Sequence, residues 1–141
     1  MGCARAGKTR VARAVRAGGD VATGGEYVEQ LRVEREHRDD VVVVLVSGEL
    51  DSTTEPRLRE ELTAAFAGAA VSGVPVVVDL TGVGFFASVG MALLVEHHRL
   101  GVRRGTPLRV VAPARSPLRA LRAAQLDQVL DLYPDLPSAL A

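Results

Sequence analysis

Three short runs of hydrophobic residues, most of them β-branched, constrain what this chain can fold into more than any other feature. They occupy residues 41–46 (VVVVLV), 75–80 (PVVVDL) and 108–112 (LRVVA). Continuous apolar runs of this length are typical of strands that are covered on both faces of a sheet. The segments between them have helical spacing, as at Leu58, Leu62 and Phe66. Alternating strands and helices predict a mostly parallel sheet with helical crossovers.

Turn and capping residues mark the ends of these elements. A polar stretch at 36–40 follows a shorter apolar segment and precedes the first run, which predicts an opening hairpin. Residues 52–56 (STTEP) supply hydroxyls and a proline for a helix start, and Gly73 ends that helix. The remaining predicted boundaries are a turn at 81–84, a helix at 89–100 that stops at Gly101, a helix from Ser116, an edge strand at 129–133 and a helical turn at 137–141.

Length and charge limit the class of protein. The 141 residues suit one domain, and 17 basic residues balance 17 acidic ones. A protein that binds nucleic acid through its overall charge would carry a basic excess, so we expect no nucleic-acid partner. No apolar run approaches the roughly 20 residues of a membrane span, and the start lacks the apolar stretch of a signal peptide. We expect a cytoplasmic protein without membrane contact.

The first 27 residues differ in composition from the rest. They are rich in Gly, Ala and Arg, so we expect residues 1–27 to be a poorly ordered extension and residues 28–141 to form the domain. Residues 2–9 (GCARAGKT) match the phosphate-binding P-loop pattern G-x-x-x-x-G-K-[ST]. A P-loop joins a buried strand to a helix, and only Met1 precedes this match. We interpret it as coincidence, and a small nucleotide-binding enzyme remains the less favoured alternative.

No other pattern indicates catalysis, a metal or a cofactor. Cys3 is the only cysteine, which excludes a disulfide framework and zinc-ligand spacing. His97 and His98 are adjacent on a predicted helix, so they point about 100° apart and cannot hold one metal from one face; we expect both to be partly exposed. No serine lies in a Gly-x-Ser-x-Gly elbow, and no carboxylate pair is placed for acid–base chemistry. We therefore expect no catalytic residues, no metal and no cofactor.

Two polar residues stand at predicted strand-to-helix junctions. Asp51 ends the strand that contains the first run, just before a helix, where its simplest role is to accept hydrogen bonds from turn and helix amides. Ser88 is predicted to cap the helix that follows it. A phosphate on Ser88 would add close to two negative charges, which the helix start would tolerate and a docked partner would not. The residues alone leave open both the structural role and the switch.

At these junctions the chain resembles a known family. From about Tyr27 to Ala141 it is similar to the anti-sigma factor antagonists, which have the STAS fold. The resemblance implies an α/β domain with a mixed sheet of four or five strands and helices mainly on one side. Three blocks in order carry it: residues 48–51 (GELD), 78–90 (VDLTGVGFFASVG) and 108–118 (LRVVAPARSPL).

The resemblance also implies a function. In that family the middle block usually reads Phe-x-Asp-Ser-Ser/Thr-Gly, and its first serine, which falls on Ser88, is phosphorylated by a partner that is both a serine kinase and an anti-sigma factor. The unphosphorylated antagonist holds this partner and frees the sigma factor, and a phosphatase resets the phosphorylated form. The family's strand-end aspartate falls on Asp51. The implied partner-binding residues are Asp51, Ser88, Val89, Gly90 and Met91.

Two departures from the family pattern bear on the switch. Ala87 replaces the acid before the serine, and Val89 replaces the following hydroxyl residue. Losing the acid weakens the implied recognition by a kinase, whereas Ser88 itself is kept. The alternative is a STAS module that serves another complex, such as a stress-sensing assembly or a lipid transporter, without a phosphorylation switch.

Overall fold

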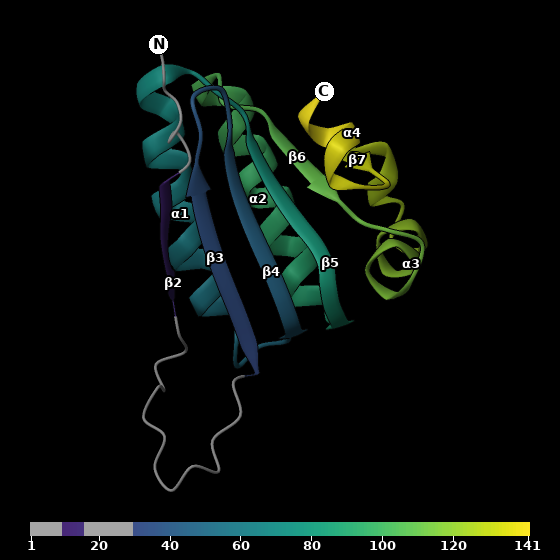
Figure 1. The fold of residues 1–141 in the computed structure, drawn as a ribbon. Coiled ribbons are helices and arrows are strands. Elements are labelled where there is room, and N and C mark those ends of the chain that lie inside the picture. The colour runs from purple at the N-terminus through teal and green to yellow at the C-terminus, as the bar shows by residue number, and fades with distance from the viewer. Residues whose placement is uncertain (1–9, 16–29) are drawn as a thin grey trace, which may run out of the picture.

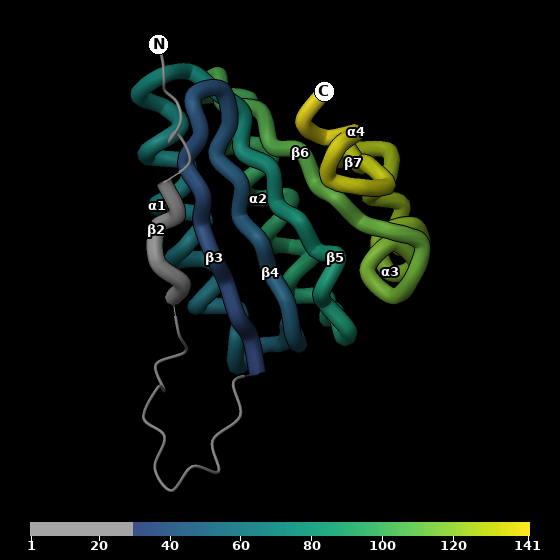
Figure 2. Tube along the Cα trace, in the orientation of Figure 1, coloured from purple at the N-terminus to yellow at the C-terminus, as the bar shows by residue number. Residues whose placement is uncertain are grey.

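The structure is a computed structural model, and it describes residues 30–141 and the backbone of residues 10–15 (Figures 1 and 2). The P-loop-like match at 2–9 lies outside the described residues, as does most of the predicted extension.

The described elements in chain order are β2 (Arg10–Val15), β3 (Leu31–His37), β4 (Val42–Leu50), α1 (Glu55–Ser72), β5 (Val76–Phe86), α2 (Ser88–Arg104), β6 (Leu108–Val111), α3 (Ser116–Ala123), the 3-10 turn η3 (Leu126–Gln128), β7 (Asp131–Tyr133) and α4 (Leu136–Leu140).

The described strands form one mixed sheet in the order β2-β3-β4-β5-β6-β7. Strands β2, β3 and β4 pair antiparallel, and β4 through β7 pair in parallel. The predicted opening hairpin is β3–β4, and the three hydrophobic runs lie side by side, with Val44 opposite Val78 and Val78 opposite Val110. Five strands come from the predicted domain, which confirms the mixed α/β sheet; a sixth, β2, comes from within the predicted extension.

The helices lie mainly on one face, as predicted. Helices α1 and α2 run behind the sheet in Figure 1, and α3 adds to the same layer. The main core lies between this layer and the sheet, with Phe66 of α1 and Leu94 of α2 fully buried in it. On the opposite face, short α4 covers a smaller cluster around Val43 and Val77.

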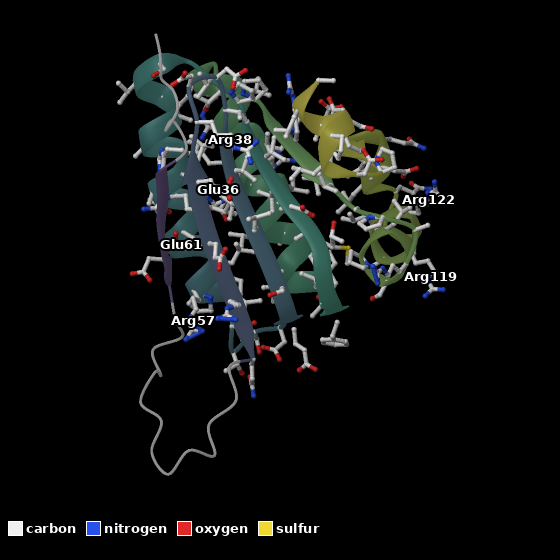
Figure 3. All side chains as sticks on the ribbon, in the orientation of Figure 1. Glu36, Arg38, Arg57, Glu61, Arg119 and Arg122 are labelled. Atoms are coloured by element: carbon white, nitrogen blue, oxygen red, sulfur yellow. The ribbon has the colours of Figure 1, made fainter. Side chains whose placement is uncertain are left out.

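An ion pair joins β3 to α1 at the margin of the core. Arg35 donates a hydrogen bond to the carboxylate of Glu61, whose side chain is only 7% exposed. Burial raises the pKa of Glu61 above its ordinary value of 4.5, and the charge of Arg35 opposes that shift. Arg35 also donates through Nε to Nε2 of His37 at 3.1 Å. Figure 3 labels Glu61, and it also labels Arg38 and Glu36, which form a separate ion pair.

Several predicted boundaries shift in the structure. The turn expected at 81–84 is wrong, because β5 continues to Phe86 while paired with the second half of β4. The helix stop expected at Gly101 is also wrong: α2 runs to Arg104, and Gly105 ends it with a φ of 73°. Gly101 lies inside the helix, where a Cβ would come within 2.4 Å of the carbonyl oxygen of Thr106.

Candidate functional site

The ends of β4 and β5 bring the two predicted site residues together. Leu50, the last residue of β4, is the register partner of Phe86, the last residue of β5. The amide of Ala87 donates to the carbonyl of Leu50 at 2.9 Å, so the parallel pairing extends past both strands. Asp51 follows Leu50 directly, and Ser88 follows Ala87. Asp51 and Ser88 therefore lie at neighbouring strand ends. Asp51 precedes α1, and Ser88 is the first residue of α2.

Asp51 organises the turn before α1. Its Oδ1 accepts hydrogen bonds from the amides of Thr53 at 2.9 Å and Thr54 at 3.1 Å, and its carbonyl accepts from the amide of Glu55. The buried Thr54 also stabilises this turn, because its hydroxyl accepts a hydrogen bond from the Asp51 amide and donates one to the carbonyl of Glu49 at 2.8 Å. Asp51 thus has the structural role that its position predicts, and its side chain remains half-buried rather than enclosed.

Ser88 begins α2, and its side chain is exposed. The prediction that Ser88 is the N-cap is wrong by one residue. Ala87 is the N-cap, with the extended backbone (φ −88°, ψ 168°) of that position, and no side chain caps this helix. The hydroxyl of Ser88 is consequently not committed to an amide of the helix start. It stands in the first turn, where the partial positive charge of the helix end favours an anion.

Gly90 sets how closely the start of α2 approaches the strands. It is buried, and a Cβ there would lie 2.6 Å from Cδ2 of Leu50 and 2.9 Å from Cε1 of Phe86. Its neighbours Val89 and Met91 are half-buried. Of the residues implied as partner-binding, Ser88 is therefore the exposed one, and Asp51, Val89 and Met91 are partly accessible. Gly90 is buried and lets the first turn of α2 pack closely against the ends of β4 and β5.

An exposed aromatic residue close to Ser88 was not predicted from the sequence. The side chain of Phe85 is 53% exposed, whereas the adjacent Phe86 is buried. The register between β4 and β5 shifts at this point, from Gly48 opposite Val83 to Glu49 opposite Phe85, which leaves Gly84 as an extra residue. The shift explains why inward and outward residues no longer alternate. The signal in the sequence was the pair of adjacent phenylalanines at a strand end, only one of which can face the core.

A small charge network ties α1 to α2. Arg59 donates to Glu55 of its own helix at 2.9 Å and to Glu96 of α2 at 2.7 Å. The hydrogen bond from Arg59 lowers the pKa of Glu96 below its ordinary value. Arg59 and Glu96 are largely exposed, so the pair between the two helices contributes little stability on its own. The network connects the first turns of α1 to the middle of α2.

Nothing in the described residues is arranged to hold a metal. No group of three or more His, Cys, Asp or Glu side chains is close enough there to do so. His97, expected to be partly exposed, is buried: its Nδ1 lies 3.0 Å from the carbonyl oxygen of Leu93 and its ring packs near Phe66. Among the described helices, none has the length and apolar character needed to span a membrane.

Comparisons with known proteins agree with this geometry. The STAS domain family matches residues 32–139. The anti-sigma-F factor antagonist RsfA of Mycobacterium tuberculosis is 31% identical over 111 residues, which cover 79% of this chain and 86% of RsfA. The crystal structure of an anti-sigma factor antagonist from Mycobacterium paratuberculosis superposes with a TM-score of 0.69 at 35% identity, covering 78% of this chain and 91% of that one. The chain belongs to the STAS domain family, among the anti-sigma factor antagonists.

Proposed function

We propose that this protein is an anti-sigma factor antagonist that binds its anti-sigma factor through the ends of β4 and β5, and that phosphorylation of Ser88 releases the complex. The binding surface, here called the Ser88 surface, consists of Asp51, Phe85, Ser88, Val89 and Met91. The observation that carries the proposal is the exposed Ser88 at the start of α2, beside the strand end of Asp51. Relatives with the same fold are named as antagonists of anti-sigma factors.

The chemistry of the switch follows from the position of Ser88. A phosphate in the first turn of α2 is compatible with the helix, because the free amides there favour a negative group. The same phosphate disfavours a docked protein, because burying an unpaired charge in an interface costs several kcal/mol. In this proposal the partner is of the kinase type and supplies the ATP, a phosphatase reverses the modification, and the protein itself works by binding.

Phe85 gives the surface an apolar anchor. Aromatic residues, phenylalanine among them, are enriched in protein–protein interfaces relative to the rest of the surface. Phe85 lies two positions before Ala87 and stands on the paired end of β5 rather than in a loop. Docking over Phe85 would bring the partner directly against Ser88, which is what a phosphorylation switch requires.

The test compares Ser88→Ala with Ser88→Asp. Both variants should fold, since the Ser88 hydroxyl caps no amide and an aspartate at a helix start is favourable. Ser88→Ala should bind the anti-sigma factor as tightly as the wild type does. Ser88→Asp should bind at least about tenfold more weakly, which corresponds to about 1.4 kcal/mol. Isothermal titration with ADP or ATP present, alongside melting curves, measures both quantities.

Ser138→Asp is the matched control. Ser138 is an exposed serine in the first turn of α4, on the opposite face of the sheet from α1 and α2. It should leave affinity for the anti-sigma factor unchanged. Equal affinity of Ser88→Ala and Ser88→Asp would refute the switch and favour a STAS module that binds without one.

A further inference from the structure

Three exposed arginines lie at and along α3. Arg119 and Arg122, three residues apart, share one side of the helix, and Arg115 is the N-cap residue immediately before it. All three are exposed, whereas Pro117 and Leu121 on the other side are buried. In Figure 3 the labelled side chains of Arg119 and Arg122 extend away from the sheet. We call Arg115, Arg119 and Arg122 the α3 arginine face.

No salt bridge neutralises these charges within the described part of the protein, and Asp127 and Asp131 line the same cavity as Arg122. Some other arginines in that part of the protein have acidic partners, as Arg35 has Glu61 and Arg59 has Glu55 and Glu96. No ion pair or side-chain hydrogen bond involves the three arginines of the α3 arginine face among residues 30–141. The protein as a whole has a formal net charge of zero. A local excess of three positive charges on two turns of helix is therefore a distinct surface feature.

Helix α3, which carries the α3 arginine face, contacts β5, the strand that leads to the Ser88 surface. Strand β6 ends at Val111, opposite Asp79, while β5 continues to Phe86. The part of β5 beyond Asp79 is flanked by α3, which contacts this strand and buries Leu121 in the same core cluster as Val83 and Phe86 (Figure 1). Phe85 lies near the end of this part of β5, and Ser88 follows at the start of α2. A partner that covers Phe85 and extends across β5 toward α3 would reach that helix.

We propose that the α3 arginine face docks an acidic surface of the anti-sigma factor and accelerates its association. This inference rests on the proposed function. Exposed charges at the margin of an interface mainly steer the encounter, so they raise the association rate and make it sensitive to salt. The exposed Phe85 on β5 and the zero net charge favour a protein partner over nucleic acid, whose binding proteins carry a basic excess.

The experiment replaces all three arginines with glutamine and measures binding to the purified kinase-type anti-sigma factor of the same organism by stopped-flow fluorescence. At low salt the triple variant should associate roughly tenfold more slowly, with little change in the dissociation rate and a weaker dependence on salt. A second variant with three lysines should keep the wild-type rate, because steering depends on charge rather than on guanidinium geometry. Melting curves verify that both variants fold.

The control is a glutamine triple at Arg99, Arg103 and Arg104. These arginines are exposed in the second half of α2, and the rise of the helix places Arg99 about 16 Å and Arg104 about 24 Å from Ser88. This triple should associate at the wild-type rate. Equal association rates and salt dependence for the α3 triple and the wild type would overturn the inference while leaving the proposed function intact.

Two other outcomes would also overturn it. If the wild type bound no anti-sigma factor at all, the proposed function would fail together with the inference. If the α3 triple instead lost binding to a duplex DNA or to vesicles containing phosphatidylglycerol, with unchanged association to the anti-sigma factor, the arginines would belong to that other contact.

Discussion

Gly48 is the residue whose replacement tests most sharply how the strand ends are built. It has a φ of +108°, a conformation that residues with a side chain rarely adopt. A Cβ at this position would lie 2.2 Å from the carbonyl oxygen of Gln30 and 3.1 Å from the Cα of Leu31. The Gln30 carbonyl is held in place because it accepts a 2.7 Å hydrogen bond from the amide of Glu49. Backbone on the neighbouring strand therefore has to move in Gly48→Ala.

The cost of Gly48→Ala combines two contributions. A side chain forced into a sparsely populated backbone conformation costs about 1–3 kcal/mol. Overpacking against atoms that cannot rotate away costs a further 1–3 kcal/mol or so. The sum, roughly 2–6 kcal/mol, is a large share of the 5–15 kcal/mol that typically separates folded from unfolded domains. At about 4 °C per kcal/mol for a domain of this size, Tm should fall by roughly 8 °C or more.

Thermal melting followed by circular dichroism measures the loss, and Gly84→Ala is the matched control. Gly84 lies at the same irregularity between β4 and β5, but no atom lies within 4 Å of the place where its methyl group would stand, and its φ is not positive. Gly84→Ala should change the free energy of unfolding by no more than about 0.5 kcal/mol. The reasoning is refuted if Gly48→Ala melts within about 2 °C of the wild type, or if the two variants lose equal stability.

Three further predictions concern the site and the core. Asp51→Ala should weaken binding of the anti-sigma factor while lowering Tm only slightly, since loss of a helix-end acceptor costs only about 1 kcal/mol of stability. Isothermal titration and thermal melting of the same variant measure the two effects, and a variant that simply unfolds would contradict the prediction. Ala87→Asp restores the family's acid and should speed phosphorylation of Ser88 by the anti-sigma factor, with an unchanged or slower rate counting against it. The raised pKa of Glu61 means that the folded state binds more protons just above pH 4.5, so this group's contribution to stability decreases as pH rises through that window. Urea unfolding at a series of pH values from 4.5 upward should therefore show Glu61→Gln gaining stability relative to the wild type as pH rises, and the opposite trend would contradict the assignment.

The architecture was readable from the sequence because its signals are local. The valine runs of β4 and β5 are apolar and β-branched, so they predict buried strands without knowledge of their pairing partners. Gly73 ends α1 with a φ of 69°, as its position predicts. Asp51 was also placed correctly, since an aspartate before a helix start accepts amides of its own turn.

What the sequence could not reveal depends on pairing between distant segments. Position 48 has no room for a side chain because the carbonyl of Gln30, just before β3, lies so close, and Phe85 is exposed because the β4–β5 register shifts there. Whether Ala87 or Ser88 caps α2 depends on where the extended backbone of β5 gives way to helix. The alternation of apolar and polar residues in Arg10–Val15 is too weak to predict a strand. The strand β2 forms there through antiparallel pairing with β3.

The hydrogen bond between Ala87 and Leu50 also has a consequence for the order of folding. Strands β3 and β4 form a hairpin across a short turn, so their contacts are local and close early. Strands β4 and β5 are parallel, and their pairing has to wait until the intervening α1 has crossed over. A nascent chain that has formed the hairpin alone displays Asp51 without Ser88 beside it. A partner that requires both strand ends therefore selects finished molecules over folding intermediates.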